Sequence, residues 1–188
     1  MVLVYSMRKE ILLKMKNCKI TSKFKIYLLI TLVWIIVIFS FSLQPAEVSS
    51  EMSSGFGKKL LETFLPELLE EFETMSGDQL GLLHHLLRKC AHFAEYFVLG
   101  ALVMMTLLQT VLHCKLPIGI GVSMLVASVD ETVQRFVPGR SGQVTDVLLD
   151  TIGAGVGVLA VHLVVRWMTI KYEISHENGG NKRRKGKN

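Results

Sequence analysis

The sequence predicts an all-α, polytopic membrane protein: a four-transmembrane-helix bundle with an extracytoplasmic amphipathic helix between the first and second spans. Three observations lead to this fold class. Half of the 188 residues are hydrophobic, and the mean hydropathy is +0.41. The apolar residues fall in long blocks between charged ends, whereas a soluble fold would spread them over one face of each element. Lys and Arg gather at both ends of the chain, which is typical of cytoplasmic segments of membrane proteins.

The apolar blocks predict spans at about 26–43, 90–112, 116–133 and 147–167. The first block contains no charged residue and is just long enough for a helix to cross a hydrocarbon core of about 30 Å. A cleaved signal peptide is the alternative, since Ser40 and Ser42 are small enough for a cleavage site. The apolar run is longer than a usual signal core and the leader before it is unusually long, so we favour a retained span.

The charge distribution predicts the topology. Residues 1–25 hold seven Lys and Arg against one acid, and residues 166–188 hold seven against two. The stretch 44–87 reverses the sign, with eight Asp and Glu against two Lys. We therefore expect a multi-pass membrane protein with both termini cytoplasmic and the acidic stretch outside. No nucleic-acid motif accompanies the basic ends, so we expect membrane lipid rather than nucleic acid as a partner.

Three regions follow: a basic cytoplasmic segment over 1–25, a membrane domain over 26–168 and a basic cytoplasmic tail over 169–188. We expect the first 20 or so residues and the tail from about Ser175 to be disordered. The three cysteines are an odd number and include no Cys-x-x-Cys pair, which argues against a disulfide framework or a thiolate metal site.

The acidic stretch contains apolar residues at helical spacing over 60–72, with glutamates between them. This pattern predicts an amphipathic helix, kinked or restarted at Pro66, that packs on the bundle as a lid. The segment Ser76-Gly77-Asp78-Gln79 has the pattern of a capping box, so we expect a long helix to start there and to continue through the second span.

Ionisable side chains in the predicted spans fall in one layer near the outer surface. Counting inward from outer helix ends near Arg88, Pro138 and Gly142 places them about 6–12 Å deep on three separate helices. Polar residues inside spans usually face the bundle interior and mark function. The members of this layer are His92, Glu95, Asp130, Glu131, Asp146 and Asp150.

The spacing also places these residues on shared helix faces. Arg88, His92 and Glu95 form one stripe, and Asp130 pairs with Gln134 four residues later. The stripe of Asp146 and Asp150 continues into Gly153 and Gly157, a Gly-x-x-x-Gly pattern that lets another backbone approach closely. The turn at Pro138-Gly139 directs Arg140 back over the acidic layer.

The segments RKCAHFAEYFVLGAL (88–102) and ASVDETVQRFVPGRSGQVTDVLLDTIGAGVG (127–157) resemble the VanZ-like family of bacterial membrane proteins. That family is named for a protein associated with resistance to the glycopeptide teicoplanin. The resemblance rests on His92-x-x-Glu95-Tyr96, Asp130-Glu131-x-x-Gln134, Pro138-Gly139-Arg140 and Asp146, and it covers most of 26–168. It implies a small polytopic protein of the cell envelope and supplies no reaction.

The residues suggest roles for a site in this layer. In a catalytic version, His92 or Glu95 is a general base, Asp130 and Glu131 are acids or metal ligands, and Arg140 clamps an anion. Asp146 is a further catalytic candidate without an assigned role. Arg88, Gln134 and Asp150 are the other candidate substrate-binding residues. The structural alternatives are a hydrogen bond from His92 to Asp130 or Asp146 and an Arg140–carboxylate pair that locks the loop.

The negative charge of five clustered carboxylates must be neutralised by arginines, by shared protons or by a divalent cation. The spacing matches no established metal signature, so a cation is the less favoured of these.

The predicted function is binding or modification of a lipid-linked or cell-wall-related substrate at the extracytoplasmic face, with a phosphate-bearing headgroup or envelope precursor as the ligand. Two other classes stay open: a non-catalytic membrane scaffold, and a small proton-coupled transporter.

Overall fold

The computed structural model describes residues 22–64 and 77–185. Its elements are α2 (Ser22–Ser42), α3 (Ala46–Phe64), α5 (Gly77–Leu108), α6 (Lys115–Gln134) and α7 (Val144–Lys185). Four of these helices contain stretches long and apolar enough to cross a membrane: Ser22–Ser42, Gly81–Leu108, Lys115–Gln134 and Val144–Tyr172. The described residues contain no strand. The predicted all-α fold with four spans is therefore confirmed.

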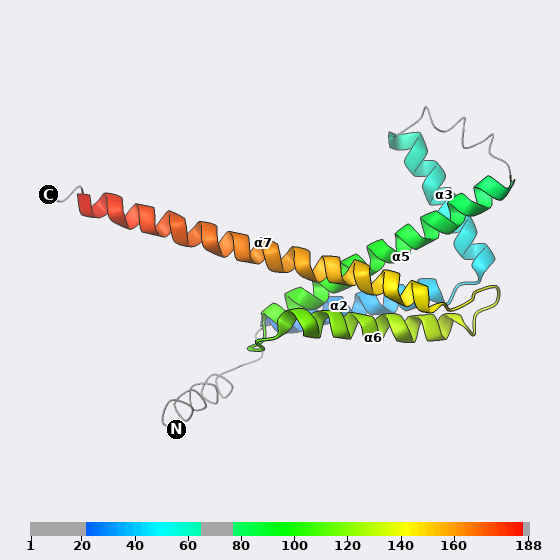
Figure 1. The fold of residues 1–188 in the computed structure, drawn as a ribbon, viewed down its shortest axis with the longest axis horizontal. Helices are drawn as coiled ribbons and strands as arrows, with labels where there is room; N and C mark the ends of the chain where they lie inside the picture. The colour runs from blue at the N-terminus through cyan, green and yellow to red at the C-terminus, as the bar shows by residue number, and fades with distance from the viewer. Residues whose placement is uncertain (1–21, 65–76, 186–188) are drawn as a thin grey trace, which may run out of the picture.

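The bundle is built around α5, which contacts all of the other described helices. In Figure 1, α7 crosses α5 at an open angle, while α2 and α6 lie beneath the crossing. The C-termini of α2 and α6 and the N-terminal portions of α5 and α7 all lie at one end of the bundle, on the right of Figure 1. This is the end that carries the predicted polar layer.

Small residues allow α5 and α7 to pack closely. A Cβ atom added to Gly153 would lie 2.7 Å from the carbonyl oxygen of Phe93, and one added to Gly157 would overlap the carbonyl oxygen of Phe97. The predicted close approach at the Gly-x-x-x-Gly face is therefore present, and its partner is α5. Elsewhere the spans expose apolar side chains, such as Ile36 and Leu125, each 65% exposed. This is expected of helices whose outer faces meet lipid.

Polar contacts attach α2 to the bundle. The Trp34 indole nitrogen donates to the carbonyl oxygen of Glu95 over 3.0 Å, and the Thr31 and Thr106 hydroxyls lie 3.1 Å apart. Because α2 is apolar on all sides, these bonds and the fully buried Ile38 select the face that meets α5.

One helix boundary differs from the sequence prediction. The third span, predicted over 116–133, is present as Lys115–Gln134, but the helix stops at Gln134 rather than near Pro138. The chain tightens there into turns in which Phe136 and Val137 donate to Val133 and Gln134. Asp130 and Glu131 therefore lie in the last turn of α6. The fourth span begins at Val144, close to the expected start.

Two segments also differ in kind. The region after α2 is helical from Ala46: its sequence is rich in Ser and Gly, but Val48, Met52, Phe56 and Leu60 recur at helical spacing. The tail expected to be disordered from Ser175 continues α7 to Lys185, because extending an existing helix is far easier than nucleating one. Most of the predicted lid (65–72) and residues 1–21 lie outside the described residues. The long helix expected after Ser76 is present, since α5 begins at Gly77.

Candidate functional site

The nine predicted site residues converge at one end of the bundle, on α5, α6, α7 and the α6–α7 loop. A small polar cavity of about 50 Å³ lies there. Six of the nine line it, and Lys89 does so as well; the six are Arg88, His92, Gln134, Arg140, Asp146 and Asp150. Glu95 lines a neighbouring groove instead. Asp130 and Glu131 are buried on α6.

Asp130 is fully buried and lies at the centre of a hydrogen-bond network. Its Oδ2 accepts from the Ser42 hydroxyl over 2.9 Å and from the Gln134 side-chain amide over 3.1 Å. The same amide group lies 3.3 Å from the Ser42 hydroxyl. Because Ser42 is the last residue of α2, this network joins the ends of α2 and α6 and holds the Asp130 carboxylate in one orientation.

Glu131 binds the start of α7. Its Oε2 accepts from the backbone amide of Gln143 over 3.0 Å, at the end of the helix where amides lack partners within the helix and the dipole favours an anion. A Cβ atom on Gly142 would overlap the carbonyl oxygen of Glu131, so glycine allows this loop to lie directly on α6. Glu131 therefore positions α7 and its carboxylates.

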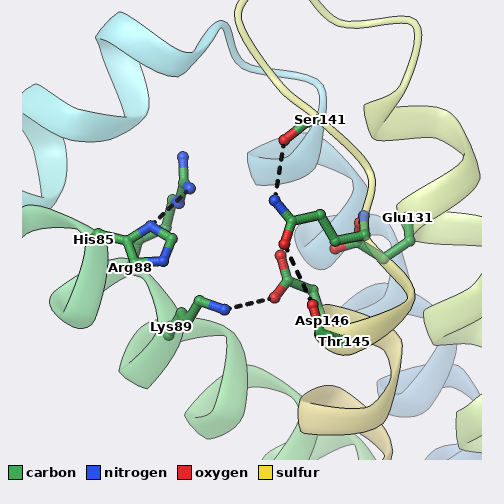
Figure 2. Close-up of polar contacts among 8 residues, drawn as sticks. His85, Arg88, Lys89, Glu131, Ser141, Thr145 and Asp146 are labelled. Atoms are coloured by element: carbon green, nitrogen blue, oxygen red, sulfur yellow. Dashed lines mark hydrogen bonds and ion pairs between the residues drawn. The ribbon is translucent and has the colours of Figure 1, made fainter.

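Asp146 is paired with Lys89 across the α5–α7 interface. Figure 2 shows the two side chains directed at each other, with Lys89 Nζ 2.8 Å from Asp146 Oδ1. Arg88, one residue earlier, turns instead to Nδ1 of His85 at 3.3 Å. Among the described residues, Asp146 therefore has a cation partner, whereas Asp130 and Asp150 have none.

Arg140 does not form the carboxylate pair expected from the sequence. Its Nη2 donates to the carbonyl oxygen of Phe41 over 3.3 Å, while its buried Nε and Nη1 have no partner among the described residues. The cause is the loop position: the carbonyl oxygen of Pro138 accepts from the amide of Ala46, which holds the loop against the α2–α3 junction. Arg140 therefore reaches the C-terminal carbonyls of α2.

Burial and the nearby acids shift the pKa of the Arg140 guanidinium in opposite directions. Burial, with help from the positive charge of Arg88, lowers the pKa of Arg140, whereas Asp130, Glu131 and Glu95 act to raise it. A guanidinium keeps its charge at neutral pH in either case. Arg140 thus places two unused N–H groups and a full positive charge beside the cavity, as an anion-binding group requires.

His92 also differs from expectation. The hydrogen bond predicted to Asp130 or Asp146 is absent, and its buried Nδ1 has no partner within the described part of the chain. The same holds for Oδ1 of Asp130 and for both carboxylate oxygens of Asp150, which is fully buried. One ligand atom each from His92, Asp130 and Asp150 lie within 4.8 Å of one another.

A larger groove of about 570 Å³ lies beside the polar cavity, between α2, α3 and α5. Most of its lining is apolar and includes Phe41, Met52, Leu87 and Ala91. Its polar end consists of Arg88, His92, Glu95 and Arg140. Arg88, His92 and Arg140 line both spaces, so an apolar chain and a polar group can be held side by side.

The sequence reasoning missed two contributors. Ser42 enters the sequence analysis only as a cleavage-site residue. A hydroxyl at the end of an apolar span is nevertheless a signal for a polar partner on another helix, which here is Asp130. Tyr96 belongs to the quoted motif but received no role. Its hydroxyl is buried near Asp130 and does not meet the geometry of a hydrogen bond.

The comparisons with known proteins agree with this architecture. No curated protein and no solved structure matches the chain. The VanZ/LLP1 family model matches residues 26–165, which include the second and third spans, most of the first and fourth, and every residue of the site. The chain, a membrane protein with four helices long enough to span the bilayer, therefore belongs to the VanZ/LLP1 family.

Proposed function

We propose that this protein binds a lipid-linked substrate with a phosphate-bearing headgroup at the extracytoplasmic face of the bacterial plasma membrane. One observation carries the proposal: the polar cavity and the apolar groove share Arg88, His92 and Arg140. An amphiphile can then place its chain along α2 and α5 and its headgroup against the guanidinium groups. Arginine is suited to this because its planar fork contacts two phosphate oxygens at once.

The proposal extends to chemical modification of the headgroup. Glu95 and Arg140 line the same groove. In a hydrolytic version, water attacks the headgroup phosphorus and Glu95 accepts its proton, with His92 as the alternative base. The P–O bond to the leaving group then breaks, and the departing oxygen takes up a proton from solvent. Arg140 stabilises the negative charge that develops on the phosphate. The family's association with teicoplanin makes glycopeptide susceptibility of the host cell the physiological readout.

Binding of a matched lipid pair tests the proposal. The full chain, purified in detergent, is titrated with a polyprenyl phosphate and with the polyprenol of the same length. We expect tighter binding of the phosphate form. Arg140→Gln should reduce that preference about tenfold or more, because hydrogen bonds to charged groups contribute about 1.5–3 kcal/mol.

Arg135→Gln is the matched control, since Arg135 is an exposed arginine on the same loop. It should keep the preference of the unmodified chain. Equal affinity for phosphate and alcohol, or an equal loss of preference in both variants, would show that the site does not recognise phosphate.

A further inference from the structure

Three helices each contribute one possible metal-ligand residue to a common point. His92 comes from α5, Asp130 from α6 and Asp150 from α7, and their ligand atoms all lie within 4.8 Å of one another. Both carboxylates are fully buried. Opposite positions in an octahedral site are about 4.2 Å apart, so a small inward movement of these side chains would let them share one ion.

The unsatisfied atoms in this cluster are all electron-pair donors. They are His92 Nδ1, Asp130 Oδ1 and both oxygens of Asp150, none of which has a partner among the described residues. Burying a carboxylate without a partner is costly. Among the described residues, no cation forms an ion pair with Asp130 or Asp150: Lys89 holds Asp146, and Arg140 donates through Nη2 to the Phe41 carbonyl.

Asp130 has the surroundings of an oriented ligand. Ser42 and Gln134 both donate to its Oδ2, which leaves Oδ1 without a hydrogen-bond donor among the described residues. Metal-binding carboxylates are commonly held by such outer partners. His92 and Asp150 also line the polar cavity, so an ion bound here would have open positions toward the space that an anionic ligand would occupy.

We propose that His92, Asp130 and Asp150 bind one divalent cation. One imidazole nitrogen with two carboxylates favours Mn²⁺ or Zn²⁺ over Mg²⁺, which prefers oxygen ligands alone. The ion neutralises the two buried carboxylates. Contact between this ion and a headgroup phosphate rests on the proposed function. His92 is then a metal ligand, which leaves Glu95 as the base.

The test is metal uptake by the full chain in detergent after treatment with a chelator. Free Mn²⁺ is followed by its paramagnetic resonance signal during titration, and Zn²⁺ by elemental analysis. We expect saturable binding of one ion per chain. His92→Gln and Asp150→Asn should weaken Mn²⁺ binding by at least about tenfold, since even outer-shell changes cost 10–100-fold. His113→Gln and Glu47→Gln, both exposed residues outside the cluster, should bind as the unmodified chain does.

A measurement on the unmodified chain protects the test against variants that fail to fold. Pulsed resonance of the bound Mn²⁺ should show coupling to a histidine nitrogen. Absence of saturable uptake of either ion by the unmodified chain, or Mn²⁺ without nitrogen coupling, would overturn the proposal, as would full affinity in His92→Gln and Asp150→Asn. Absence of metal uptake would mean that protons, rather than a cation, neutralise the Asp130 and Asp150 carboxylates.

The lipid titration separates this proposal from the proposed function. Metal uptake without preference for the phosphate lipid would leave the cation site standing and remove the phosphate ligand. If the chain takes up no metal but still prefers the phosphate lipid after chelator treatment, the proposed function stands and the cation site is removed.

Discussion

Substituting a glycine of α7 by alanine should push α5 and α7 apart, and the displacement should be larger where the new Cβ atom would lie closer to the backbone of α5. On Gly153 the new Cβ would lie 2.7 Å from the carbonyl oxygen of Phe93, and Cβ contacts under 3.0 Å are essentially never seen. The helices must therefore move apart by at least about 0.3 Å there. On Gly157 the overlap with Phe97 is more severe. On Gly155 nothing lies within 4 Å.

The expected order of stability follows from two opposing terms. Overpacking costs about 1–3 kcal/mol, whereas alanine improves helix propensity by about 1 kcal/mol relative to glycine. Gly155→Ala should therefore be as stable as the unmodified chain or more so. Gly153→Ala should be less stable and Gly157→Ala the least stable. Thermal unfolding in detergent and titration with a denaturing detergent both measure this order.

The same substitutions should disturb the candidate site. Phe93 follows His92 directly on α5, and Gly153 lies one turn beyond Asp150 on α7, so a separation at this contact increases the distance between His92 and Asp150. We expect Gly153→Ala to weaken Mn²⁺ binding while Gly155→Ala leaves it unchanged. Equal stability and equal metal affinity in these two variants would refute the close-packing argument.

Three further predictions concern single contacts. Ser42→Ala removes a donor from a buried carboxylate and should destabilise the protein by about 1–3 kcal/mol, whereas Ser40→Ala, whose exposed hydroxyl binds only its own helix, should have little effect on the same unfolding assay. Lys89→Met should lower the melting temperature only slightly, because its ion pair with Asp146 is partly exposed and such pairs contribute roughly 1 kcal/mol or less. The difference in melting temperature should shrink at high salt. A large decrease that does not depend on salt would contradict this. An impermeant thiol reagent added to intact cells should label a cysteine introduced by Glu47→Cys but not the native Cys114, since the two positions lie at opposite ends of the bundle. Labelling of Cys114 alone would mean that the topology is inverted. Labelling of both positions would contradict their placement on opposite sides of the membrane.

The convergence of the site could be predicted because it depends on local periodicity. His92 and Glu95 lie on one stripe of α5, and Asp150 shares a face with Gly153, whatever the rest of the chain does. A small-residue face must meet a neighbouring helix, and Gly153 does meet Phe93 on α5. One position along the helices was less well predicted, the end of α6. The chain leaves α6 at Gln134 rather than near Pro138, because turns formed before Pro138 replace its last helical turn.

The partners could not be predicted, because several acids and cations of similar reach compete in one layer. Lys89 rather than Arg140 pairs with an acid, since the loop at Pro138 is anchored to Ala46 and directs Arg140 to the end of α2. The partner of Asp130 on α2, Ser42, lies 88 residues away in sequence. No periodicity relates two such positions.

The sequence by itself determined the four spans and the end of the bundle that is polar, because helix length and facing depend on residues only a few positions apart. The tertiary structure alone decided which charges are neutralised and which are left facing one another. Asp146 received Lys89, and Asp150 received no partner among the described residues. The physical reason is that a helical face allows many neighbours, while the distance between atoms on separate helices depends on how all of the helices pack together.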